Sequence, residues 1–84
     1  MKNTGYRIEN KILNIPLLVE IADKRKMSLE DLSIMIGCSR PYLRNRKNEI
    51  KRGLYRECCS EIVKAAMKVL DLSYDDLVID IPKR

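Results

Sequence analysis

The sequence contains no histidine, no tryptophan and no phenylalanine, and its three glycines are scattered rather than gathered in a phosphate-binding loop. Without histidine the chain lacks the commonest general base and the commonest metal ligand. No neighbouring group would activate a cysteine as a nucleophile. We therefore expect no catalytic residue, no metal site and no cofactor, and we do not expect an enzyme.

Cysteine and long apolar runs are also scarce. The three cysteines are odd in number, and Cys58 and Cys59 are adjacent, so they do not resemble a disulfide framework. A reduced, cytoplasmic protein is the expectation. No apolar run is long enough to span a membrane or to form the core of a signal peptide, so no membrane contact is expected.

The chain is rich in basic charge, and that charge is concentrated. The net charge is +5 over 84 residues. The window from Arg40 to Arg56 holds seven basic residues and a single acid, Glu49, which gives the window a net charge of +6. Such a window is typical of a surface that binds the phosphate backbone of a nucleic acid, and a solvated charged loop is the alternative.

The basic window overlaps the stretch with the clearest helical signals, residues 28–48, SLEDLSIMIGCSRPYLRNRKN. Ser28 predicts a helix N-cap, and Gly37 predicts that this helix ends at a left-handed residue. Ser39 predicts the N-cap of a second helix, with Leu43 facing back toward the first. Two short helices joined by a tight glycine turn form a helix-turn-helix, whose second helix can enter the major groove of DNA.

This stretch resembles the DNA-binding domains of Cro, the phage repressors and the wider XRE class of bacterial regulators. The resemblance lies in SLEDLSIMIGCS and, further along, in VLDLSYDDLV, and it covers Pro16 to Val78. It implies an all-α fold, a compact lambda-repressor-like helix-turn-helix domain of four to five helices. It also implies a transcription regulator that binds a palindromic operator in double-stranded DNA as a homodimer. The short chain favours a phage or mobile-element regulator over a ligand-sensing repressor.

Docking of the second helix in the major groove would turn the residues near its start toward the bases. The candidate base-reading residues are Ser39, Arg40, Pro41, Arg44, Asn45 and Asn48. An arginine can donate two hydrogen bonds to guanine, and an asparagine can read adenine or hold a phosphate. Candidate phosphate contacts, which set affinity and position rather than sequence, are Lys47, Lys51, Arg52 and Arg56.

The chain departs from the family pattern at two places. Several family members have a basic residue near position 22 that pairs with an acid near position 47. This chain has Ala22 and Lys47 at these positions, so the ion pair is absent or is replaced by another contact. Arg46 stands where the family has an apolar residue, and we expect Ile50 to replace its packing by extending the helix one turn. Tyr42 is expected to pack on the first motif helix, with the edge of the groove as the alternative.

Three further helices are predicted around the motif. The first is capped by Asn14 or Ile15. Another runs from about Arg56 to Leu70, and Ser73 caps a last short helix whose Leu77 closes the core. The predicted buried stripes are Leu17, Leu18, Ile21 and Ala22 in the first helix and Ile62, Val63, Ala66, Met67, Val69 and Leu70 in the later one.

These helices divide the chain into an N-terminal arm (residues 1–14), the DNA-binding domain (residues 15–78) and a C-terminal tail (residues 79–84). The arm is expected to carry a short helix near its end, and it either reaches a minor groove or is a frayed terminus. Three apolar residues lie where the domain meets the tail, namely Val78, Ile79 and Ile81. They either form a dimer contact or cover the subunit's own core.

A second class of function fits the same helices. The domain could be a protein-interaction module, such as an antirepressor, a polymerase-docking protein or an antitoxin that also binds DNA. In that case its partner would be a protein. The charge of the Arg40–Arg56 window argues against this class, whereas DNA binding without salt dependence would argue for it.

Overall fold

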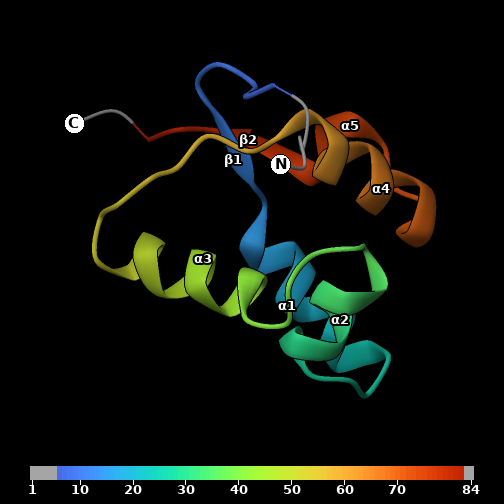
Figure 1. Cartoon of the computed structure of the whole chain (residues 1–84). Helices are drawn as coiled ribbons and strands as arrows, with labels where there is room; N and C mark the ends of the chain where they lie inside the picture. Colours follow the sequence, from blue (N-terminus) through green and yellow to red (C-terminus); the bar gives the residue numbers. More distant parts are fainter. Residues whose placement is uncertain (1–5, 83–84) are drawn as a thin grey trace.

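Five helices and two strands follow one another in the computed structural model, which describes residues 6–82 (Figure 1). The helices are α1 (Ile15–Lys24), α2 (Leu29–Met35), α3 (Tyr42–Lys51), α4 (Ser60–Leu70) and α5 (Tyr74–Leu77). The strands are β1 (Lys11–Leu13) and β2 (Val78–Asp80). The domain is therefore small and mainly helical, and the all-α prediction is correct only in part because the two strands form a sheet.

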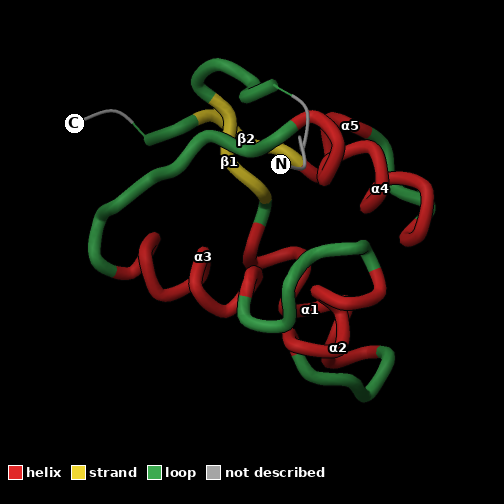
Figure 2. Tube along the Cα trace, viewed as in Figure 1, coloured by secondary structure: helices red, strands yellow, loops and turns green. Residues whose placement is uncertain are grey.

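The sheet joins the two ends of the described chain. β1 and β2 pair antiparallel, with Ile12 opposite Ile79 and Leu13 opposite Val78 (Figure 2). The backbone N–H of Asn14 donates to the carbonyl of Leu77 at 2.7 Å, which continues the pairing to the start of α1. The prediction of a short helix near the end of the N-terminal arm is wrong, because those residues are the strand β1.

Residues 6–14 are packed into the domain rather than extended from it as an arm. The N–H of Ile8 donates to the carbonyl of Cys58 at 2.9 Å, and Arg7 forms a bridge with Cys59. Ile12 is buried. The part of the predicted arm that remains, residues 1–5, lies outside the described residues.

Val78, the residue just before the predicted tail, packs into the subunit's own core. Val78 is only 4% exposed, and β2 pairs with β1 of the same chain. Ile79, on the opposite face, is 37% exposed, and Ile81 is half-buried. Of the two alternatives for these residues, the cover over the core is the one that Val78 adopts.

The first helix begins as predicted. The Asn14 side chain accepts a hydrogen bond from the N–H of Leu17 at 3.3 Å, so Asn14 is the N-cap of α1. Its buried face consists of Ile15, Leu18 and Ala22. The predicted stripe is thus correct at Leu18 and Ala22, while Leu17 is half-buried.

The start of α4 differs from the prediction by four residues. The helix begins at Ser60 rather than Arg56, because Cys58 and Cys59 are extended and bond to the N-terminal segment. Its buried face is Ser60, Val63, Ala66 and Leu70. The predicted stripe is thus correct at Val63, Ala66 and Leu70, with Ile62 and Met67 partly buried against the core, and it is wrong at Val69, which is 38% exposed.

The last helix and the core agree with the sequence. The Ser73 hydroxyl accepts from the N–H of Asp76 at 3.2 Å, and Leu77 is fully buried.

Figure 1 shows α1, α2 and α3 grouped on one side, and the sheet with α4 and α5 on the other. One apolar cluster connects the two groups, since it contains Leu18 and Leu32 as well as Val63 and Leu77. Among residues 6–82, no helix combines the length and apolarity that crossing a bilayer requires.

Candidate nucleic-acid interface

The turn between α2 and α3 is built from local signals. The Ser28 hydroxyl accepts from the N–H of Asp31 at 3.0 Å, which caps α2 as predicted. Gly37 has a φ of 89°, a conformation that costs glycine little and other residues much, and it ends α2. The N–H of Cys38 then donates to the carbonyl of Ser33 at 2.9 Å, which turns the chain toward α3.

Ser33 fastens the two motif helices together. Its hydroxyl donates to the carbonyl of Leu29 at 2.9 Å and accepts from the backbone N–H of Leu43 at 3.1 Å. Both Ser33 and Leu43 are fully buried. Because the N–H of Leu43 belongs to the first turn of α3, it has no partner within its own helix, and the Ser33 hydroxyl supplies one. The start of α3 is therefore fixed in position relative to α2.

The start of α3 itself differs from the sequence prediction. The helix begins at Tyr42 with Pro41 at the N-cap position, and its cap makes no side-chain hydrogen bond. Ser39 is thus not the N-cap, although its carbonyl accepts from the N–H of Tyr42 at 3.1 Å in a tight turn. Proline disfavours helical backbone at the residue before it, so the helix does not include Arg40. Three candidate base-reading residues consequently lie in the turn that precedes α3.

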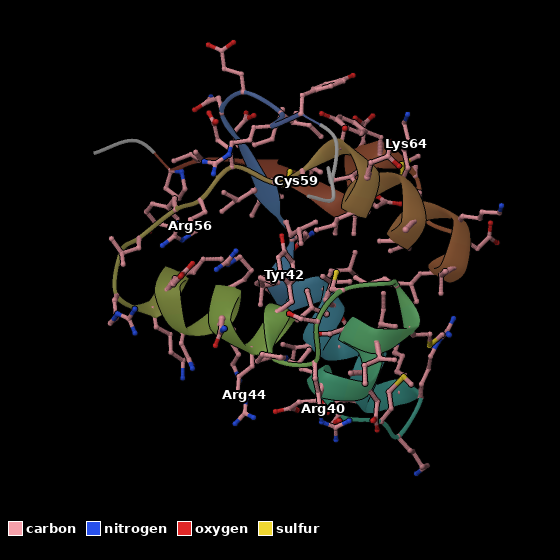
Figure 3. All side chains as sticks on the ribbon, viewed as in Figure 1. Arg40, Tyr42, Arg44, Arg56, Cys59 and Lys64 are labelled. Atoms are coloured by element: carbon pink, nitrogen blue, oxygen red, sulfur yellow. The ribbon has the colours of Figure 1, made fainter. Side chains whose placement is uncertain are left out.

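All six candidate base-reading residues are exposed: Ser39, Arg40, Pro41, Arg44, Asn45 and Asn48. Figure 3 shows Arg40 and Arg44 along one edge of the α2–α3 pair, on the side away from the sheet. Tyr42 and Arg56 lie on the opposite side of α3, facing the sheet. α3 thus presents one face to the protein and leaves the candidate reading face open to solvent.

The inner face of α3 carries a cluster of charged side chains around Glu49. The Arg46 guanidinium pairs with Glu49 through two contacts, Nε to Oε1 at 2.9 Å and a hydrogen bond from Nη2 to Oε2 at 3.1 Å. Arg56 donates from Nε to the same Oε2 at 3.0 Å. Arg46 also lies over the Tyr42 ring, 5.0 Å from its centroid. The Glu49 cluster (Tyr42, Arg46, Glu49 and Arg56) therefore ties α3 to the loop that follows it.

The inner face of α3 confirms the predictions for Ile50 and Tyr42. α3 extends to Lys51, and Ile50 packs against the core, as expected from the arginine at position 46. Tyr42 packs against the core too, rather than lying at the edge of a groove.

The Glu49 carboxylate offsets the positive charge of Arg46 and Arg56 within the basic window. Desolvation raises its pKa, but hydrogen bonds from Arg56 and Arg46 and their positive charge outweigh this, and the net pKa lies below 4.5. Arg56, a candidate phosphate contact, is thus already paired with an acid. Lys51 and Arg52 are exposed, and Lys47 is half-buried.

Sequence reasoning missed an acid beside the reading face. Glu30, in the first turn of α2, forms an ion pair with Arg44, from its Oε2 to Nη2 of the arginine. The Glu30 side chain is 19% exposed, whereas that of Arg44 is 58% exposed. A carboxylate in a first helical turn looks like a helix-dipole partner from sequence alone. Only the packing of α2 on α3 shows that it reaches Arg44.

A separate hollow of about 360 Å³ lies between the N-terminal segment, α4 and α5. Its walls include Tyr6, Met67, Tyr74 and Lys64. Tyr6 is 74% exposed and Tyr74 is 37% exposed. Lys64 lies far from Arg40 and Arg44 in Figure 3, and none of the lining residues belongs to α2 or α3.

The thiols of Cys38, which is half-buried, and Cys58, which is buried, are desolvated. Burial raises the pKa of Cys38 and of Cys58 to about 11, so both thiols are protonated at neutral pH. Within residues 6–82, no three potential ligand side chains gather into a metal-binding group.

Comparison with known proteins adds no family to these observations. No protein-family model, no curated protein and no solved structure matches the chain.

Proposed function

We propose that this chain is a sequence-specific, double-stranded DNA-binding transcription regulator with a lambda-repressor-like helix-turn-helix. The observation that carries the proposal is the exposed row formed by Arg40, in the turn before α3, and by Arg44, Asn45 and Asn48 on α3 itself. The helix is fixed by the buried Leu43 side chain and by the Leu43 N–H, which donates to the Ser33 hydroxyl. Arginine and asparagine are the residues that read guanine and adenine from the major groove.

The charge around this row supplies affinity. Lys51 and Arg52 are exposed at the end of α3, and Lys47 lies one turn earlier. Basic side chains at these places are suited to phosphates on either side of the groove, because they release counterions from the DNA. Binding should therefore weaken as salt rises.

The regulator acts as a homodimer in this proposal. The domain measures 34 × 28 × 25 Å. Two such domains side by side can place their α3 helices in successive major grooves, which are about 34–36 Å apart on one face of DNA. A two-fold axis between them would match a palindromic operator.

The test is selection of binding sites from a pool of random duplexes at moderate salt. The wild type should enrich a palindromic site. Arg44→Ala should relax the preference at one base pair in each half-site. Lys64→Ala is the matched control, since it removes the same charge from an exposed position on α4 and should leave the site unchanged. Enrichment of no site would contradict sequence-specific binding.

A protein-interaction module is the second candidate, and the hollow beside α4 and α5 favours it. Exposed tyrosines flanking an apolar hollow are typical of a docking surface. If the protein bound no duplex at any salt concentration, while Tyr74→Ala abolished binding to a protein partner, this second function would replace the first.

A further inference from the structure

We infer that Glu30 is a positioning residue for base reading, because its carboxylate holds the Arg44 guanidinium in place before DNA arrives. The inference rests on the proposed function and deepens it. It assigns the base preference at one position of the DNA site to a pair of residues from two helices, Glu30 of α2 and Arg44 of α3.

The anchor of the pair is Glu30. Its side chain is only 19% exposed, so the carboxylate lies against the protein surface rather than in open solvent. It stands in the first turn of α2, where the helix dipole favours a negative charge. The cap at Ser28 holds that turn, and Ser33 joins the helix to α3. The carboxylate is therefore a fixed point beside the reading face.

The guanidinium keeps enough donors to read a base. Arginine has five N–H donors, and the contact with Glu30 engages the Nη2 end. The Arg44 side chain is 58% exposed, so its remaining N–H groups face solvent at the edge that Figure 3 shows. A guanidinium held at one end and open at the other can still donate two hydrogen bonds to guanine O6 and N7.

Arg40 provides the contrast. It lies on the same edge and is also exposed, but none of the ion pairs found among residues 6–82 involves it. Arg40 must lose its rotamer freedom when it meets DNA, whereas Arg44 has already lost part of it. The two arginines should therefore differ in selectivity, with Arg44 the stricter reader.

The experiment compares Glu30→Gln with Asp31→Asn. Both substitutions remove one negative charge from the first turn of α2, but the Asp31 side chain is exposed and makes no ion pair among those found in the described chain. On the selected site, Glu30→Gln should reduce the discrimination against other bases at the Arg44 position by roughly 2- to 12-fold, the effect of ordering one long side chain. Asp31→Asn should preserve that discrimination.

Two further variants test whether Glu30 acts through Arg44. Arg44→Ala should abolish the preference at that base pair, and adding Glu30→Gln to it should change nothing more, because the two residues act through one contact. Thermal unfolding of Glu30→Gln and Asp31→Asn should coincide, so a general loss of stability would not explain the change in base preference.

Three outcomes would overturn the inference. Equal base preferences for Glu30→Gln and Asp31→Asn would show that the contact between Glu30 and Arg44 does not set the preference. A sharper preference in Glu30→Gln would show that the carboxylate competes with DNA for Arg44. A wild type that enriches no site would remove the proposed function as well, and it differs from the first two outcomes because they require a selected site.

Discussion

Replacing Ser33 by alanine removes the hydroxyl that joins α2 to α3. The backbone N–H of Leu43, which is buried, would then lose the partner that now lies 3.1 Å away. A buried donor without a partner costs about 1–3 kcal/mol. Alanine is also the better helix former, which returns at most about 0.7 kcal/mol in the interior of α2.

The net loss of unfolding free energy for Ser33→Ala is therefore about 0.3–2.3 kcal/mol. In a domain of this size each kcal/mol lowers Tm by roughly 4–8 °C, so a drop of several degrees is expected. Circular dichroism during heating and urea titration would measure it. The same substitution should also weaken DNA binding, since α3 loses its fixed position relative to α2.

Ser39→Ala is the matched control, because Ser39 is exposed and is not the cap of α3. Its unfolding free energy should lie within about 0.5 kcal/mol of the wild type. If Ser39→Ala were the more destabilising of the two, α3 would begin at Ser39, and the assignment of Ser33 as the link between the helices would be refuted.

Other substitutions test the core, the charge and the Glu49 cluster. Leu77→Ala, at a fully buried site, should cost about 2–5 kcal/mol of unfolding free energy in urea titration, and a loss below 1 kcal/mol would contradict its place in the core. Lys51→Ala should reduce the slope of log affinity against log salt by about 0.9, while Arg56→Ala should reduce it less because Glu49 already pairs with Arg56; equal slopes would oppose this. The lowered pKa of Glu49 adds stability that is present above pH 4.5 and is lost as pH falls through the folded-state value. Glu49→Gln should therefore be less stable than the wild type at pH 7, and this difference should shrink as pH falls into the acid range below 4.5. A constant difference across that range would refute the pairing.

Local chemistry made several elements predictable from the sequence. Ser28 and Ser73 cap the helices assigned to them, and Gly37 has the positive φ that the end of α2 requires. Each signal depends on neighbours within a few residues. The length of α3 is predictable for the same reason. Arg46 stands where an apolar residue is expected, and Ile50, one helical turn later, supplies the apolar contact with the core.

Features that depend on distant residues were not predictable. The sequence predicts an arm in place of β1 because the partner strand, β2, lies at the other end of the chain. The sequence predicts the start of α4 four residues too early, because the hydrogen bonds that keep Cys58 extended are made with Ile8 and Lys11. The pairing of Glu30 with Arg44 likewise requires two helices to be packed before it can be seen.

The most direct measurement of the central claim maps the DNA-contacting face by amide chemical shifts. Unlabelled duplex would be titrated into ¹⁵N-labelled protein at moderate salt. We predict that the largest changes fall on residues 39–52, which hold the turn before α3 and the helix itself, while residues 60–77 change little. Changes centred on α4 and α5, or none at any duplex concentration, would contradict the assignment of α3 as the recognition helix.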